Sequence, residues 1–235
     1  KKTLPLNNNN EISFDYIEII SRKSKKKISI KNLNSLPKLL KKKIILDLKK
    51  ITSKKKNFSK LNFNKIPNIM GVLNLTPDSF SDGGKFNIKD KGIKHAIQMF
   101  RSGANIIDVG GESTRPGSKA VNKNVEWNRI HKILKFICKK IPVSLDTRKS
   151  EVMEKGINQG VKIINDISGL RYDIETINIL KKHNIPFVIH HSKGIPENMQ
   201  DKPFYKNELL DIYDFFEKKI KFLRSIGIEH NNIII

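Results

Sequence analysis

Short apolar runs that alternate with segments of helical spacing constrain the fold of this chain more than any other feature. Six such runs occur after residue 65, at 69–73, 105–109, 142–145, 162–167, 186–190 and 232–235. Between them, apolar residues recur every three or four positions, as on one face of a helix. Near-continuous apolar strands separated by amphipathic helices are typical of a parallel sheet that is buried on both faces.

Polar residues at the ends of these runs help to choose between two α/β folds. A doubly wound open sheet gathers its ligand at one switch point, and no GxGxxG or GxxxxGK sequence follows the first run. A β/α barrel spreads its site over the carboxyl ends of many strands. Five runs end in polar groups, at Asn74, Asp108 to Glu112, Asp146, Asn165-Asp166 and His190-His191. We therefore predict a (β/α)8 TIM-type barrel over residues 66–235, with about six of its eight strands present.

Residues 1–65 differ in composition, and we predict a small lysine-rich extension there. They hold 19 Lys and Arg against 4 Asp and Glu, and so carry most of the net charge of +23. Apolar stretches at 12–20, 28–30 and 44–48 alternate with lysine runs and indicate a small β-containing extension, with a lysine-rich connector near residues 49–65.

The high positive charge suggests a nucleic-acid-binding protein, because clustered lysines release counterions from a phosphate backbone. Few aromatic side chains stand among the lysines of residues 1–65, which argues against such a binder. Abundant Asn and Ile accompany the lysines, a mix that a genome rich in A and T produces without selection for binding. We favour a solvated appendage and expect no specific nucleic-acid partner.

Membrane and disulfide signals are missing from the sequence. No apolar run reaches the roughly 18 residues of a membrane span, and the first residues lack a signal-peptide pattern. Cys138 is the single cysteine, so it cannot form an internal disulfide, and its apolar neighbours suggest a place in the core. We expect a soluble, cytoplasmic protein without a membrane partner.

Two loops and three short motifs follow the predicted strands. The loops are GVLNLTPDSFSDGG (71–84) and GGESTRPG (110–117), and the motifs are SLDT (144–147), IINDI (163–167) and His191 with Gly194, Pro196, Met199 and Gln200. In order and spacing they resemble the dihydropteroate synthases of the pterin-binding family. The resemblance implies condensation of 6-hydroxymethyl-7,8-dihydropterin diphosphate with p-aminobenzoate to 7,8-dihydropteroate and pyrophosphate. This is a step of folate biosynthesis and a target of sulfonamides.

Asp146 and Asn165 end neighbouring predicted strands and together suit a pterin ring. The ring presents an amino group beside a ring N–H, which one buried carboxylate can accept in two hydrogen bonds. Its other polar atoms require a side chain that both donates and accepts. Taken singly, Asp146 could cap the next helix and Asn165 could belong to a turn. Together they favour a pocket.

Asn74 and Arg115 suit a diphosphate. The neutral oxygen of Asn74 can bind a Mg²⁺ that also takes diphosphate oxygens, as the matching asparagine does in the family. Capping of the turn before Pro77 is the alternative role for Asn74. Arg115 can grip a phosphate or carboxylate with two parallel hydrogen bonds, and its alternative is an ion pair with Glu112.

The resemblance also implies that the loops at 75–84 and 112–118 close over the reaction intermediate and exclude water. Charge develops on the departing diphosphate, where the metal and Arg115 would act, and Asp146 would compensate positive charge on the ring. The implied substrate-binding residues are Asp146, Asn165, Thr114, Arg115, Pro116, Phe80 and His191. The implied catalytic residues are Asp146, Arg115 and Asp82.

His190 and His191 resemble a metal-binding pair, yet neighbouring strand residues point to opposite faces. We therefore predict one inward histidine, and the family pattern selects His191. Family members usually have a methionine where His190 stands, so the packing around the pterin is expected to differ here.

Family members continue beyond the last residue of this chain with further pterin-binding and diphosphate-binding groups. The resemblance thus implies an incomplete chain, inactive as a fragment, and a homodimer when complete. A pterin-binding methyltransferase domain on the same barrel is the alternative, but the Arg115 loop and the NLTPDSFSDGG loop count against it.

Overall fold

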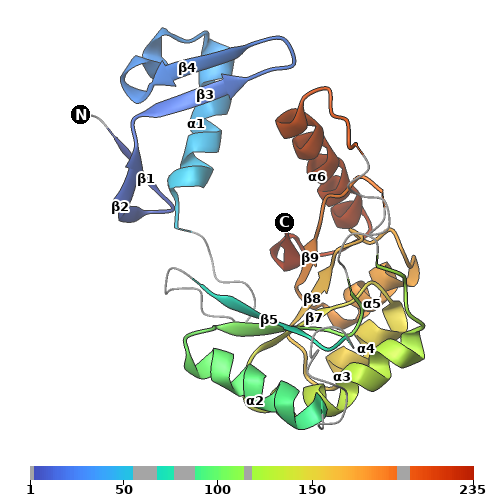
Figure 1. The fold of residues 1–235 in the computed structure, drawn as a ribbon. Coiled ribbons are helices and arrows are strands. Elements are labelled where there is room, and N and C mark those ends of the chain that lie inside the picture. Colours follow the sequence, from blue (N-terminus) through green and yellow to red (C-terminus); the bar gives the residue numbers. More distant parts are fainter. Residues whose placement is uncertain (1–2, 55–67, 77–87, 114–117, 195–201) are drawn as a thin grey trace. The chain divides into compact units, whose positions relative to one another are not determined.

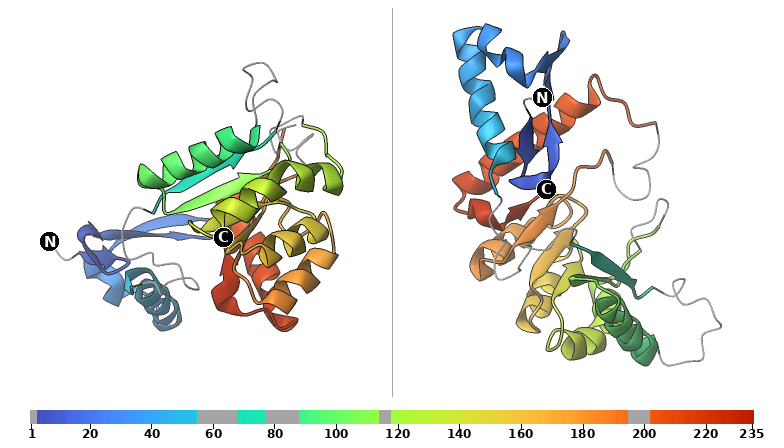
Figure 2. Two further views of the ribbon diagram at one scale, coloured as in Figure 1. Left: turned by 90° about the horizontal axis from the view of Figure 1, so that it is seen from below. Right: turned by 90° about the vertical axis from the view of Figure 1, so that its left-hand side faces the viewer.

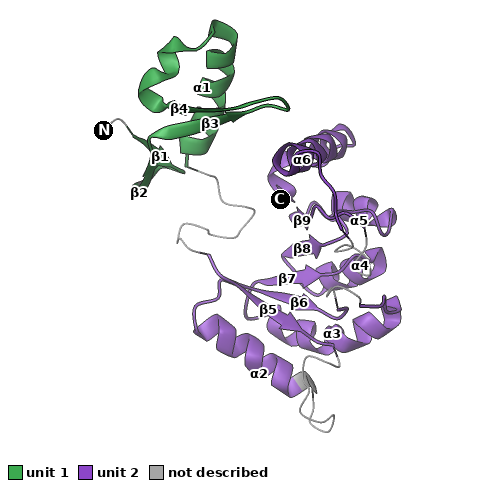
Figure 3. Cartoon of the chain, turned by 45° about the horizontal axis from the view of Figure 1, so that its top comes forward, with its two compact units in different colours: residues 1–57 green, residues 58–235 purple. Residues whose placement is uncertain are grey.

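The chain divides into two compact units, residues 1–57 and 58–235 (Figure 3). The structure, a computed structural model, describes residues 3–54, 68–76, 88–113, 118–194 and 202–235. Each unit is considered by itself.

Unit 1, residues 1–57, combines two β-hairpins with a helix. β1 (Leu4–Leu6) pairs antiparallel with β2 (Asn9–Phe14), and β3 (Tyr16–Ile20) pairs with β4 (Lys25–Ser29). The chain continues through the 3-10 helix η1 (Ile30–Ser35) into α1 (Lys38–Thr52). The unit contains β structure, as expected, while the apolar stretch 44–48 and the first residues of the expected connector are helical in α1.

Unit 2, residues 58–235, is built on one parallel sheet of six strands (Figure 1). Strands that follow one another in sequence are also neighbours in the sheet. They are β5 (Met70–Asn74), β6 (Ile106–Gly110), β7 (Val143–Asp146), β8 (Ile163–Asp166), β9 (Phe187–Ile189) and β10 (Ile233–Ile234). Each predicted run contains one of these strands, and the predicted α/β class is confirmed. Within the described residues the sheet is open, with β5 and β10 at its edges.

Helices connect the strands and cover one face of the sheet (Figures 1 and 2). They are α2 (Ile88–Arg101), α3 (Lys123–Ile137), α4 (Ser150–Asn158), α5 (Glu175–His183) and α6 (Glu208–Ser225), and the 3-10 helix η3 (His230–Asn232) precedes β10. The side chains of Asn122 and Asn207 cap α3 and α6 by accepting hydrogen bonds from first-turn amides. Among the described residues, no helix has the length and apolar character of a membrane span.

The register of the strands separates the core from the site. One cross-strand row is apolar and almost fully buried, and it consists of Leu73, Val109, Leu145, Ile164, Phe187 and Ile233. These six side chains join the α2 to α6 residues in the main core cluster. Because successive strand residues point to opposite faces, the next row faces away from this core. That row consists of Asn74, Gly110, Asp146, Asn165, Val188 and Ile234.

Candidate active site

The second cross-strand row brings three predicted site residues together. Asn74 is paired with Gly110, Gly110 with Asp146, and Asp146 with Asn165. Gly110 leaves the space between its neighbours open, because a Cβ there would lie 3.4 Å from both Asn74 Oδ1 and Asp146 Oδ2. Asn74, predicted to bind diphosphate, and Asp146 and Asn165, predicted to bind the pterin, thus lie in one row on the same face of the sheet.

Asn165 also contacts Asp108, which was noted as a strand-end residue but not predicted as a site residue. The Nδ2 atom of Asn165 donates a hydrogen bond to Asp108 Oδ2 at 2.9 Å. Asp108 lies two residues before Gly110 in β6 and so shares its face of the sheet. Burial raises the pKa of Asp108, although the nearby Ser144 hydroxyl, the hydrogen bond from Asn165 and the nearby His190 oppose the shift. A charged residue inside an otherwise apolar strand was the sequence signal for this contact.

The two histidines after β9 point to different surroundings. His190 Nε2 lies 2.8 Å from Asn165 Oδ1. The ring of His191 instead packs edge-on against Phe215 of α6, with 4.7 Å between ring centroids. This corrects the expected position of the inward histidine, which was His191. The register explains it, because Val188 pairs with Asn165 and the residue two positions further along shares that face.

Asp146 supplies the carboxyl group of the row. Its pKa is raised well above the ordinary value, first by burial and then by the negative charges of Asp108, Glu126, Asp166 and Glu112. The possible role of Asp146 as a helix cap is not realised. A ligand that donates hydrogen bonds to Asp146 would stabilise the ionised form of this carboxyl group.

Asp173 and Asp166 stabilise the loops around the site. Asp173 Oδ2 accepts the first amide of α4, from Ser150, at 2.8 Å, so this aspartate takes the capping role considered for Asp146. Asp166 accepts hydrogen bonds from the Ser168 and Leu170 amides. These two carboxylates therefore order the backbone after β8.

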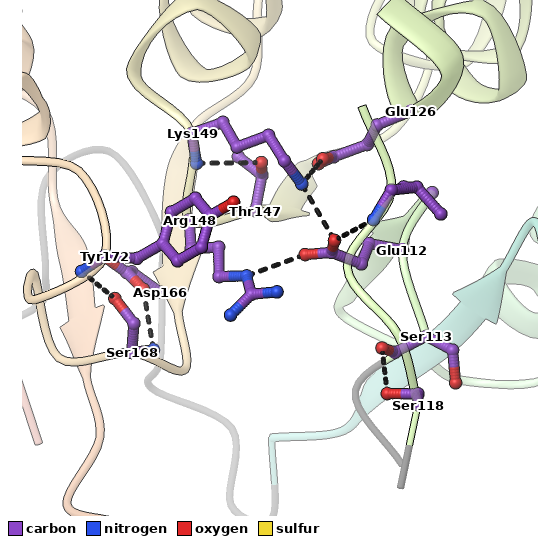
Figure 4. Close-up of polar contacts among 12 residues, drawn as sticks. Glu112, Ser113, Ser118, Glu126, Thr147, Arg148, Lys149, Asp166, Ser168 and Tyr172 are labelled. Atoms are coloured by element: carbon purple, nitrogen blue, oxygen red, sulfur yellow. Dashed lines mark hydrogen bonds and ion pairs between the residues drawn. The ribbon is translucent and has the colours of Figure 1, made fainter. Parts of the chain in front are cut away.

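A buried ion network joins the loops that follow β6 and β7 (Figure 4). Arg148 Nε donates to Glu112 Oε2 at 2.8 Å, and Lys149 Nζ lies 3.0 Å from Glu112 Oε1 and 2.5 Å from Glu126 Oε2. All four side chains are at most 8% exposed. The Arg148 guanidinium also lies over the ring of Tyr172, 4.0 Å from its centroid. Sequence analysis missed this network, because its ion-pair partners lie 23 to 37 positions apart in the chain.

The pKa values of the two glutamates in the network are shifted in opposite directions. Burial opposes ionisation of Glu112, but hydrogen bonds from Arg148, the Val121 amide and Lys149 outweigh it and lower its pKa. Burial dominates at Glu126, and its pKa is raised despite the contact with Lys149. Glu112 is therefore the ionised centre of the network.

The network holds both sides of the Arg115 loop. Glu112 Oε1 accepts the Val121 amide at 2.8 Å, and Ser118 Oγ donates to the Ser113 carbonyl at 2.7 Å. Five predicted residues lie outside the described part of the chain, namely Phe80, Asp82, Thr114, Arg115 and Pro116. The alternative ion pair between Arg115 and Glu112 falls there too, although Glu112 already has two cationic partners.

Among the described residues, a Mg²⁺ site is plausible only if a bound substrate supplies some of the ligands. They contain no cluster of three or more His, Cys, Asp and Glu side chains able to hold a metal by themselves. Asn74 offers one neutral oxygen beside the gap at Gly110. Mg²⁺ commonly takes one or two protein oxygens and completes its shell with phosphate and water. This donor set suits a substrate-bound Mg²⁺.

Comparison with known proteins places the chain among pterin-binding proteins. The family model described as "Pterin binding enzyme" matches residues 70–235. A dihydropteroate synthase from Clostridium beijerinckii is 42% identical over 188 residues, which cover 79% of this chain and 65% of the relative. The solved Yersinia pestis dihydropteroate synthase with a sulfonamide drug complex has a TM-score of 0.66 and 37% identity, covering 71% of this chain and 61% of that one.

A further solved relative contains the product named above. Dihydropteroate synthase from Xanthomonas albilineans, in complex with 7,8-dihydropteroate, has a TM-score of 0.61 and 27% identity. The match covers 71% of this chain and 58% of that one. The chain thus spans less than two thirds of the length of each of these relatives.

Replacing Glu112 should strongly destabilise the protein. Glu112→Gln leaves Arg148 and Lys149 buried without their shared counter-charge, and breaking such a buried pair costs about 3 kcal/mol or more. Denaturant unfolding of the variant and the parent measures this loss. Lys182→Met is the control, because it breaks an exposed ion pair with Glu154 and should have far less effect. Equal losses in the two variants would contradict the role of the network.

Replacing Asp146 should change how stability depends on pH. Between about pH 3.9, the pKa of an unfolded aspartic acid, and its raised folded pKa, the native state holds a proton that the unfolded chain has released. The free energy of unfolding of the parent should therefore fall as the pH rises through this window. Asp146→Asn cannot ionise, so it should be more stable than the parent above the window and converge with it below. Denaturant unfolding at a series of pH values measures both curves, and a variant less stable at neutral pH would refute the expectation.

Proposed function

This chain belongs to the pterin-binding enzyme family, and from that premise we propose that the full-length protein is a dihydropteroate synthase. Its substrates would be 6-hydroxymethyl-7,8-dihydropterin diphosphate and p-aminobenzoate. Its products would be 7,8-dihydropteroate and pyrophosphate. The relative that is solved with 7,8-dihydropteroate supports this choice of chemistry.

The row formed by Asn74, Gly110, Asp146 and Asn165 is the observation that carries the proposal. Asp146 would accept the amino group and the neighbouring ring N–H of the pterin. Those donors would relieve the cost of a carboxylate that is buried among other carboxylates. Asn165 would donate and accept at the adjacent edge of the ring.

The diphosphate would lie on the Asn74 side of Gly110. Asn74 would hold Mg²⁺ through its amide oxygen, and a bound Mg²⁺ would neutralise charge on the diphosphate. Arg115 would bind the departing diphosphate with two parallel hydrogen bonds. The anchored flanks of its loop, at Ser113 and Val121, support a defined approach to the site.

The proposed reaction breaks one bond and forms another at the pterin methylene carbon. The carbon–oxygen bond to the diphosphate breaks, and its electron pair leaves with pyrophosphate. The amine nitrogen of p-aminobenzoate then bonds to that carbon and loses a proton. The negative charge of Asp146 would stabilise the cationic pterin, while the loops containing Phe80, Asp82, Thr114 and Pro116 would exclude water.

The full-length protein should release pyrophosphate only when the pterin diphosphate, p-aminobenzoate and Mg²⁺ are all present. A coupled pyrophosphate assay and mass spectrometry of 7,8-dihydropteroate measure the reaction. A sulfonamide should compete with p-aminobenzoate. Folded protein that binds neither substrate and forms no product would refute the proposal.

Substitutions in the row should separate binding from rate. Asp146→Asn and Asn165→Ala should each weaken pterin binding by about 2 to 4 kcal/mol, because they leave buried polar groups unpaired. Arg115→Ala should mainly lower kcat, since its partner gains charge in the transition state. Calorimetry and steady-state kinetics measure the two effects, with the exposed Asn178→Ala as a control. Unchanged pterin affinity in both pocket variants would remove the pocket assignment.

A further inference from the structure

The His190 ring lies on the pocket face of the sheet, at the end of β9. Val188 pairs with Asn165 in the site row, and His190 follows two positions later on the same face. Its ring reaches across to β8, where Nε2 lies 2.8 Å from Asn165 Oδ1. Both side chains are only partly buried, so parts of both remain accessible to a ligand.

The contacts of Asn165 define the direction of the hydrogen bonds. Asp108 Oδ2 accepts a hydrogen from Asn165 Nδ2 at 2.9 Å, which turns the amide oxygen toward His190. Because an amide oxygen can only accept, His190 Nε2 must donate. Rotating the amide by half a turn would place its oxygen against the Asp108 carboxylate, which cannot donate when ionised. Asp108 therefore selects the orientation of the amide, and that orientation assigns the donor role to His190 Nε2.

The backbone at His190 packs against the loop that follows β8. A Cβ on Gly169 would lie only 2.6 Å from the His190 carbonyl oxygen, so the loop after β8 packs directly against this residue. Gly169 has a φ of 63°, which glycine adopts without strain. Arg171 adds hydrogen bonds to the carbonyl and hydroxyl of Ser192, at 3.1 and 2.7 Å. The loop after β8 therefore contacts the backbone of His190 and is bonded to Ser192, two residues further along.

After these two contacts, Asn165 can still donate one hydrogen bond and accept one from a ligand. One amide hydrogen is used by Asp108 and one oxygen lone pair by His190, so one hydrogen and one lone pair remain. A merely structural His190 would complete the packing without affecting these remaining groups. The two roles therefore predict different responses to loss of the Nε2 donor.

We propose that His190 is a positioning residue that donates from Nε2 to Asn165 Oδ1 and thereby presents the remaining amide hydrogen and lone pair to the pterin. The inference rests on the proposed function, because it requires that Asn165 contacts a pterin. It adds a residue that determines the donor and acceptor pattern of the pocket.

Two substitutions test the donor. His190→Met keeps the bulk but removes the hydrogen bond, and it should weaken pterin diphosphate binding by about 5- to 10-fold in calorimetry. His190→Gln keeps an N–H donor on a side chain of similar reach and should restore binding to within about twofold of the parent. In an Asn165→Ala background, His190→Met should cause no further loss. The exposed His95→Met is the matched control and should bind like the parent.

Each outcome decides for or against the inference. Equal binding by the parent and His190→Met, or equal weakening in the Met and Gln variants, would overturn the role of His190 while leaving the proposed function intact. Failure of the folded parent to bind the pterin would overturn both. Nitrogen NMR of the unaltered protein needs no variant, and it should find a hydrogen on Nε2 of His190. An Nε2 atom without a hydrogen would refute the proposal.

Discussion

The parallel register of β5 to β8 is the constraint on which the rest of the structure depends. Pairing in this register places Leu73, Val109 and Leu145 in one row against the helices and moves the polar row to the opposite face. A shift of any strand by one residue would exchange the two rows. The apolar core therefore determines where the polar side chains of the site lie, because burying the first row aligns the second.

The site combines two electrostatic environments of opposite character. Between the loops that follow β6 and β7, Glu112 is matched by two cations, and this network joins the two loops. In the polar row, Asp146 faces other carboxylates and has no comparable cation among the described residues. A structure optimised for stability alone would neutralise that group. Its retention fits a site in which the substrate supplies the missing donors.

The sequence predicted the strands better than the contacts among side chains. Apolar runs identified all six strands, since buried parallel strands leave little room for polar residues. Alternation showed that His190 and His191 face apart, but only the pairing of Val188 with Asn165 decides which ring lies beside the polar row. The Glu112, Arg148 and Lys149 network was not predicted, because its partners meet only after β6 and β7 pair. Arg115 and Asp82 lie outside the described residues, so their roles still rest on family resemblance.

Gly110 limits the shape of the polar row through the side chain it lacks. A methyl group there would reach ordinary contact distance, 3.4 Å, from the oxygens of both Asn74 and Asp146. Alanine would therefore fill the space between these two side chains without a clash, and a larger residue would extend further into it. The absent side chain at position 110 thus sets the width that is left between the two oxygens.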